Sequence, residues 1–375
     1  MIVGGGVTGL SIAYNLAKIG ASVTIIERGY IGSGSSTRNA ANARAHFFNK
    51  EATIIAWESL KLMYKLSKEL NYNTLFIKRG YLWLLYTEEQ YKRFKQFREF
   101  WSKLGIPDGK MLSVEDLKER YPFLNLKGVI GGFLGHVNGR YHHDAIVRGY
   151  WRACKNLGVK IYEYTEAKKL IREGSKVVGV ETNVGKVYAR KCVVLAAGPW
   201  TRLLAKSVGI DLPIEPVRKE LLVTEPVKIK IKPLVISMKT NAYVQQTLRG
   251  EVLGSVETPM DIPIWEFKST YQFPLRTVRA IIELVPALAV VNFMRQWAGH
   301  YDVTPDNNPI LGFIDEIENL AVAAGFSGHG FMLAPAVGKY MALLLDKGHL
   351  DPIIKPFNYR RFKEGKLITE QLVIG

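Results

Sequence analysis

The sequence predicts a fold of the α/β class into which a second domain of the α+β class, built on an antiparallel sheet, is inserted. Three observations predict it. A strand, a glycine turn, a helix and a second strand follow one another in the first 27 residues. A second strand and turn follow at 191–200 and lead into a helix. Between 214 and 298 the pattern changes to the short strands typical of an antiparallel sheet, and the chain then returns to α/β patterns.

The glycine turn has the G-x-G-x-x-G spacing of a Rossmann-type dinucleotide-binding unit. Gly4 permits the tight turn, Gly6 lets the backbone approach a pyrophosphate, and Gly9 lets the helix pack closely on the strand. The N–H groups at the start of the helix, where Val7 and Thr8 lie, would face the phosphates. The alternative is a glycine-rich helix start in another α/β fold.

An acid ends the second strand. Glu27 lies 18 residues after Gly9, where a carboxylate can accept hydrogen bonds from both ribose hydroxyls. The loop at 30–44 is rich in small and hydroxyl residues and is suited to lie against a cofactor, although a flexible linker is the alternative. Arg38 and Arg44 favour cofactor contact, because two arginines would serve no purpose in a plain linker. The predicted contacts here are Glu27, Arg28, Ser33, Ser35, Ser36 and Arg38.

The remaining elements follow from periodicity and from turn residues. Helices are predicted at 51–70, 88–104, 144–157, 269–286 and 332–346, and strands at 81–86, 159–164, 176–181, 186–189, 220–224, 242–246, 252–255, 290–298 and 320–324. Ser113 opens a short further helix with a capping box. We therefore predict a discontinuous nucleotide-binding domain at 1–69, 128–213 and 299–375, and a substrate domain at 70–127 and 214–298.

Composition indicates a globular protein. The 375 residues are 47% hydrophobic and 23% charged, and no apolar run reaches the roughly 18 residues of a membrane span. Only three residues precede Gly4, so we expect that the chain starts late or that a few residues are missing. The two cysteines, Cys154 and Cys192, stand outside any C-x-x-C motif, which argues against a disulfide framework or a zinc site and favours a cytoplasmic location.

The charge is strongly positive, with 51 Lys and Arg against 34 Asp and Glu, a net +17. Such a surplus fits nucleic acid, an anionic membrane, an acidic substrate or an acidic partner subunit. The segment 91–101 is both basic and aromatic, but its aromatic residues recur at helical spacing. We therefore expect the aromatic stripe to pack inward and the basic face to meet solvent. The chain has no RNA-binding motif, so we expect no nucleic acid.

Four segments together resemble the D-amino-acid oxidase/sarcosine oxidase class of FAD-dependent oxidoreductases. They are the glycine turn with Glu27, the loop at 32–44, the turn at 196–200, and the stretches at 295–299 and 325–331. Within the class, the sequence is most similar to β subunits of heteromeric sarcosine oxidases and of archaeal dye-linked L-proline dehydrogenases. The phrases W-A-G-x-Y-x-x-T-P-D at 297–306 and A-A-G-F-S-G-H-G-F-M at 323–332 carry that similarity.

The resemblance implies a Rossmann-like FAD-binding domain. The helix that opens at 328–330 would direct its positive end at the flavin N1/O2 edge, and His329 could donate a hydrogen bond there, although a capping role is the alternative. Gly299 occupies the place of a cysteine that tethers FAD in related enzymes, so the cofactor is expected to be non-covalent. The resemblance adds Ala167, Ala197, Gly198, Trp200, Gly299, Gly325, Ser327, Gly328, His329, Gly330 and Met332 to the predicted FAD contacts.

The resemblance also implies a small amino-acid substrate. Arg44 matches a carboxylate-binding arginine, whereas Met332 replaces the second carboxylate-binding residue, a lysine. Tyr243 and Gln246 are further candidates, with an ordinary core strand as the alternative. The expected reaction is oxidation of a secondary amino acid, L-proline first and sarcosine second, to the imine by hydride transfer to flavin N5. Positioning carries most of this chemistry, so no dedicated base is expected.

His143 matches the position where heterotetrameric sarcosine oxidases attach a second flavin, FMN, and a helix-capping role is the alternative. FMN would then lie at an interface with a second subunit, and electrons would leave through it or to an external acceptor. The alternatives within the class are a glycine or D-amino-acid oxidase or dehydrogenase and a glycerol-3-phosphate-type dehydrogenase. A flavin-bearing RNA- or membrane-associated factor, peripheral at the membrane, is the alternative from another class.

Overall fold

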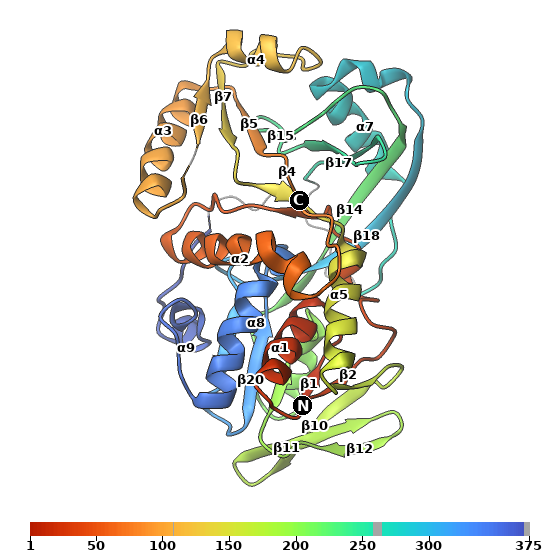
Figure 1. Cartoon of the computed structure of the whole chain (residues 1–375), viewed down its shortest axis with the longest axis vertical. Coiled ribbons are helices and arrows are strands. Elements are labelled where there is room, and N and C mark those ends of the chain that lie inside the picture. The colour runs from red at the N-terminus through yellow and green to blue at the C-terminus, as the bar shows by residue number, and fades with distance from the viewer. Residues whose placement is uncertain (108, 258–264, 371–375) are drawn as a thin grey trace.

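The computed structural model describes residues 1–107, 109–257 and 265–370. A six-stranded sheet with the order β19-β20-β13-β1-β2-β9 forms the centre of the lower half of Figure 1. Five strands are parallel, and β19 joins the edge antiparallel to β20. The strands are β1 (Ile2–Val3), β2 (Thr24–Ile26), β9 (Lys160–Tyr162), β13 (Val193–Leu195), β19 (Ile310–Phe313) and β20 (Leu320–Ala324).

Helices cover one face of this sheet. Ile2, Ile25 and Val194 point toward that face and belong to the same core as α1 (Val7–Lys18), α5 (His143–Asn156) and α8 (Gly330–Lys347). The alternate residues of the same strands point to the other face, as expected for a strand. They pack with α6 (Trp200–Lys206) and with the three-stranded sheet of β10 (Ala167–Glu173), β11 (Lys176–Thr182) and β12 (Gly185–Tyr188).

An eight-stranded sheet occupies the upper half of Figure 1, with the order β18-β14-β17-β16-β15-β5-β7-β6. It is antiparallel except for the parallel pair β15–β5. Its strands are β5 (Tyr81–Leu85), β6 (Lys110–Leu112), β7 (Gly131–Gly135), β14 (Glu215–Pro226), β15 (Leu234–Ser237), β16 (Tyr243–Gln246), β17 (Glu251–Ser255) and β18 (Phe293–Val303). The helices α3 (Glu88–Lys103), α4 (Val114–Arg120) and α7 (Gln272–Leu284) lie against it.

Two features connect the two large sheets. The first is the long pair β14–β18, which runs from the upper sheet down to the six-stranded sheet (Figure 1). The second is the layer formed by α2 (Lys50–Glu69), which packs on α8, and by a small sheet of β3 (Asn42–Ala43), β8 (Gly139–Arg140) and β4 (Ile77–Lys78). Short helical segments complete the described chain: η1 (Ser35–Thr37), η2 (Pro286–Val290), η3 (Lys355–Phe357) and α9 (Arg360–Lys363).

The predicted fold class is confirmed, with local corrections. The boundary at 128 is wrong, because β7 pairs with β5 and β6 in the eight-stranded sheet. The predictions also miss β3, β4, β6, β10, β15 and β19. They start β18 too early, since residues up to Val290 form η2.

Three local predictions can be checked directly. Phe94 and Trp101 are buried, so the aromatic stripe of α3 does pack inward. The capping box at Ser113 is present. No helix in the described part of the chain combines the length and the apolar character needed to cross a membrane.

Candidate active site

A cavity of about 570 Å³ lies at the carboxyl ends of the parallel strands, where the two large sheets meet. Val3 and Ile26 line it from the six-stranded sheet, and Leu221 and Tyr243 from the eight-stranded sheet. Parallel sheets bind ligands at this edge, and the volume is in the range of cofactor and small-molecule sites.

The glycine turn forms one end of the cavity. Gly4 has a φ of +112°, and a Cβ there would lie 2.3 Å from the carbonyl oxygen of Ala196. Gly9 does not line the cavity, which corrects its place among the cofactor contacts. A Cβ there would lie 2.0 Å from the carbonyl oxygen of Gly4, so Gly9 instead permits the close approach of helix and strand. Gly6, Val7 and Thr8 do line the cavity, at the N-terminus of α1.

Glu27 is held in a fixed orientation at the end of β2. Its Oε2 accepts a hydrogen bond from the Gly5 N–H (2.7 Å), and its Oε1 accepts one from the Gly29 N–H (2.8 Å). The Ser33 hydroxyl donates a longer one to Oε1 (3.3 Å). A carboxylate held in this way at the cavity wall is placed to accept hydrogen bonds from ribose hydroxyls.

Two arginines of the following loop have aromatic partners. The Arg28 guanidinium carbon lies 3.7 Å from the centre of the Trp200 ring, and that of Arg38 lies 4.4 Å from the Phe267 ring. Arg38 Nε is buried and has no hydrogen-bond partner among the described residues. A buried cationic N–H facing a cavity requires an acceptor, and the pyrophosphate of a dinucleotide supplies one. The residues at this end of the cavity therefore fit FAD.

Arg44 and His329 form the wall at another part of the cavity. Arg44 Nη2 and His329 Nε2 are 3.1 Å apart, and the two residues are 3% and 4% exposed. Phe47 packs against both, 4.4 Å from the guanidinium carbon and 4.8 Å from the imidazole centre. Burial lowers the pKa of Arg44. Burial, together with the Arg44 charge, holds the pKa of His329 well below its ordinary value.

Four tyrosines also line the cavity: Tyr81, Tyr141 and Tyr243, which are buried, and Tyr301, which is half-buried. Burial raises the pKa of each, to about 12 for Tyr301. All four hydroxyls therefore stay protonated and can donate hydrogen bonds at neutral pH. Sequence reasoning identified only Tyr243. Tyr301 lies within the W-A-G-x-Y phrase that carried the resemblance, whereas Tyr81 and Tyr141 had no local signal that pointed to the cavity.

A second glycine-rich turn, at residues 325–330, leads into α8. Asp302 is the anchor of this turn, since its carboxylate accepts from the Gly325 N–H (2.6 Å) and its carbonyl accepts from the Ser327 N–H (3.0 Å). Burial raises the pKa of Asp302 to about 6. Gly328 has a φ of +90°, and a Cβ there would lie 2.3 Å from the Tyr301 ring. Only a glycine fits beside that ring.

Most predicted site residues line the cavity. They are Gly4, Gly6, Val7, Thr8, Glu27, Arg28, Ser33, Ser35, Ser36, Arg38, Arg44, Ala167, Ala197, Gly198, Trp200, Tyr243, Gly299, Gly328, His329, Gly330 and Met332.

Four further predicted residues lie outside the lining, as Gly9 does. Gly325 and Ser327 shape the turn behind it, where the Ser327 hydroxyl accepts from the Thr304 N–H (3.2 Å). Gln246 is corrected as a substrate contact, because its side-chain amide binds the backbone of Ile231, Val227 and Gly250 instead. The fourth residue, His143, lies at the start of α5 and away from the cavity lining.

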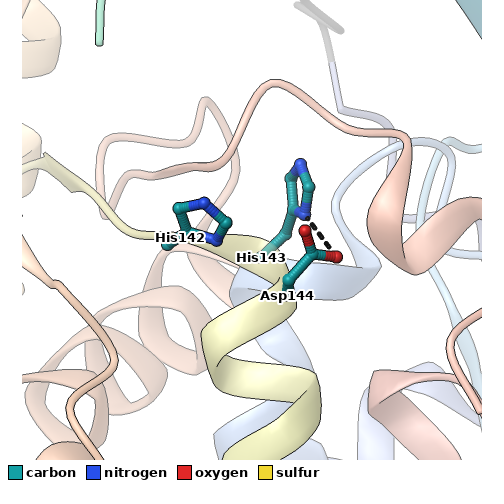
Figure 2. Close-up of side chains that lie close together, drawn as sticks. All are labelled: His142, His143 and Asp144. Carbon is teal, nitrogen blue, oxygen red and sulfur yellow. Dashed lines mark ion pairs between the residues drawn. The ribbon is translucent and has the colours of Figure 1, made fainter. Parts of the chain in front are cut away.

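His143 begins α5 (Figure 2). Its Nδ1 lies 3.2 Å from the carboxylate of Asp144, and His142 precedes it with an exposed side chain. One side-chain nitrogen of each histidine and one carboxylate oxygen of Asp144, the kinds of atom that bind metal ions, all lie within 4.8 Å of one another. His143 does not line the cavity, so a flavin attached to it would lie outside the cavity.

Comparison with known proteins agrees with this geometry. The sequence profile of the family described as "DAO: FAD dependent oxidoreductase" matches residues 1–344. The chain is 32% identical to the sarcosine oxidase subunit beta of Rhodobacter capsulatus, over all of this chain and 91% of that protein. Among solved structures, the L-proline dehydrogenase from P. horikoshii matches with a TM-score of 0.91 and 37% identity, over 98% of each chain. The glycine oxidase from Geobacillus kaustophilus matches with a TM-score of 0.88 and 26% identity, over 96% of this chain and 97% of that chain.

The chain belongs to the DAO family of FAD-dependent oxidoreductases. Within that family it is similar to sarcosine oxidase β subunits, to an L-proline dehydrogenase and to a glycine oxidase. These matches confirm the resemblance to the D-amino-acid oxidase/sarcosine oxidase class and the prediction of an FAD-dependent enzyme.

Proposed function

We propose that this protein oxidises a secondary amino acid to its imine with FAD, L-proline being the first choice of substrate and sarcosine the second. The observation that carries the proposal is a buried arginine, Arg44, in the wall of a cavity that fits FAD at its other end. A guanidinium in the wall of the cavity can bind an anionic ligand group, and an amino-acid carboxylate is such a group. The similarity to an L-proline dehydrogenase and to sarcosine oxidase β subunits supports the choice of substrates.

Some residues of the cavity bind the substrate, and others orient it. Arg44 binds the carboxylate, and the hydroxyls of Tyr243 and Tyr301 help to orient the substrate. When bound, FAD supplies the acceptor for the hydride from the substrate α carbon. The aromatic walls exclude water, which strengthens the interaction between Arg44 and the carboxylate.

FAD would be held non-covalently. Gly299 lines the cavity where a tethering residue would have to stand, and its hydrogen side chain cannot form a covalent bond to a flavin. The segments 1–69, 136–213 and 299–375 would make up the FAD-binding domain, and 70–135 and 214–298 the substrate domain.

We further propose that the chain is the catalytic β subunit of a heteromeric complex in the cytoplasm. The similar Rhodobacter protein is itself named a subunit, and a net charge of +17 suits an acidic partner. A second flavin, FMN, at His143 would lie at the interface with that partner and pass electrons toward an external acceptor. Extraction of flavin from the purified protein and complex, quantified as FAD and FMN per chain, tests both points.

Anaerobic reduction tests the substrate. The FAD-loaded protein is mixed with L-proline, sarcosine, glycine, D-amino acids and glycerol 3-phosphate, and the flavin absorbance is followed. We expect L-proline to bleach the flavin fastest. Fastest bleaching by glycine, a D-amino acid or glycerol 3-phosphate would select one of the alternatives in the same class. If none of these compounds reduced the flavin, the proposed function would fail.

A further inference from the structure

The contact between Arg44 and His329 joins two distant parts of the chain. Arg44 directly follows β3, whereas His329 is the N-cap residue of α8, 285 positions later. Their nitrogens, Arg44 Nη2 and His329 Nε2, are 3.1 Å apart. At that distance one nitrogen donates a hydrogen and the other accepts it.

The chemistry of the two groups decides which nitrogen is the donor. A guanidinium has five N–H donors and no acceptor, and it stays protonated in proteins. Arg44 Nη2 therefore donates, and His329 Nε2 accepts with its lone pair. A neutral imidazole that accepts through Nε2 carries its proton on Nδ1. A protonated imidazole would instead place two cations in contact in a buried site.

The side chains around His329 also favour a neutral imidazole. The Phe47 ring meets the imidazole edge-on, at 75°, and also covers the Arg44 guanidinium. Among the described residues, the charge that acts on His329 is that of Arg44, and it lowers the pKa of the imidazole further than burial alone. The titratable groups whose charges act on Arg44 are Glu370, Tyr81 and Tyr301.

We propose that His329 is a neutral, Nδ1-protonated hydrogen-bond acceptor that positions the Arg44 guanidinium for a substrate carboxylate. This role differs from the predicted donation of a hydrogen bond by His329 to the flavin N1/O2 edge. The carboxylate part of the proposal rests on the proposed function, whereas the tautomer and the contact with Arg44 do not. His329 is thus a positioning residue that acts through Arg44.

Nitrogen NMR of the FAD-loaded protein tests the tautomer. The seven histidines are labelled with ¹⁵N, and the His329 signals are assigned by their loss in a His329→Gln variant. We expect an unprotonated Nε2 and a protonated Nδ1 that do not titrate between about pH 5.5 and 8.5. A protonated Nε2, or a ring that titrates within that interval, would overturn the proposal.

Two substitutions test the positioning of Arg44. His329→Gln keeps an acceptor oxygen near the place of Nε2, whereas His329→Leu fills similar space without an acceptor. The probe is pyrrole-2-carboxylate, whose binding is followed through the flavin spectrum, and pyrrole serves as the matched probe without a carboxylate. We expect His329→Leu to weaken binding of the carboxylate about tenfold and His329→Gln to stay within about threefold, with pyrrole unaffected by either.

Equal weakening by both variants, or no weakening by His329→Leu, would contradict the positioning role. Thermal unfolding of each variant shows whether it folds, and the NMR result, which needs only His329→Gln for its assignment, decides the tautomer even if His329→Leu does not fold. Failure of the proposed function is separable. If no amino acid reduces the flavin while Nε2 is unprotonated, the substrate proposal fails and the histidine assignment stands.

Discussion

At the scale of single residues, the site combines side chains that a local sequence pattern predicts with side chains that no local pattern predicts. Glu27 and the glycines stand in a short motif with a known spacing, and a local pattern predicts them. The four tyrosines come from separate strands and loops, and they meet only because the chain folds back on itself. Gln246 shows the opposite error. It lies on the predicted strand, but its side-chain amide forms hydrogen bonds with the backbone of a neighbouring loop.

Arg44 carries the first prediction. We expect Arg44→Ala to weaken binding of the substrate carboxylate about 100-fold, because a charge-assisted bidentate contact is lost, and Arg44→Lys to restore part of it. The measurement is the substrate concentration that gives half-maximal anaerobic flavin reduction. Arg98→Ala on the exposed face of α3 is the control for removal of one positive charge. Wild-type affinity in Arg44→Ala would rule out the carboxylate contact.

Asp302 carries a prediction about pH. Its pKa is about 6 in the folded protein, against 3.8 as the ordinary value. Since the folded state binds this proton more tightly than the unfolded chain, Asp302 favours folding at about pH 4, and that contribution is lost as the pH rises through 6. The loss amounts to roughly 3 kcal/mol at about 1.4 kcal/mol per pH unit.

The test compares Asp302→Asn with the wild type. Asparagine does not titrate, so the free energy of unfolding of the variant relative to the wild type should increase between about pH 4 and pH 7, by at most roughly 3 kcal/mol. Denaturant unfolding at several pH values measures the difference. Asp346→Asn, at an exposed position, controls for the change in net charge. A difference that does not change with pH would show that the pKa of Asp302 is not raised in the folded state.

At the scale of helices and strands, elements with strong local signals were predicted and those that depend on distant partners were missed. The first strand, its glycine turn and α1 carry their signals within 20 residues. In contrast, β15 has only four residues and pairs in parallel with β5, more than 140 positions earlier in the chain. Pairing energy of that kind is absent from a local window, so periodicity alone does not detect such a strand.

The packing of α1 against α8 depends on a glycine within α8. A Cβ at Gly338 would lie 2.0 Å from the Ser11 hydroxyl and 2.7 Å from the Ser11 backbone. We therefore expect Gly338→Ala to lower the free energy of unfolding by about 1–3 kcal/mol, as overpacking does, although alanine favours a helix. Chemical denaturation measures the change. Gly34→Ala is the control, because a Cβ there meets open space and its φ is not positive. A more stable Gly338→Ala protein would show that the helices can move apart at little cost.

At the scale of the whole molecule, a buried ion pair attaches the last described segment to the rest. The Arg361 guanidinium contacts both oxygens of Asp306 at 2.7 and 3.0 Å, with side-chain exposures of 2% and 0%. The Ile368 N–H donates to the same carboxylate. Further along, the Glu370 carboxylate accepts from the Phe48 N–H beside the start of α2. One segment thus links the loop after β18 with the helix α2.

Removal of one partner of this pair should be costly. We expect Asp306→Ala to lower the free energy of unfolding by about 3–5 kcal/mol, because it leaves a buried guanidinium without its carboxylate. The neighbouring pair Arg360–Asp315 is exposed on both sides, so Asp315→Ala should cost less than about 1 kcal/mol. Thermal or denaturant unfolding compares the two variants. Equal costs would mean that the buried pair contributes no more than a surface pair.

The β14–β18 ladder has a kinetic consequence. Its pairing is regular from Glu215 opposite Val303 to Val223 opposite Arg295, and the register shifts by one residue before Thr224. Its middle part, around Leu221 and Gly299, is also a wall of the cavity. A ladder of this length resists bending between the two sheets, so we expect the sheets to move as one body. Entry and exit of small molecules then depend on fast fluctuations of the surrounding loops, on nanosecond to microsecond timescales, and not on a slow rotation of one sheet against the other.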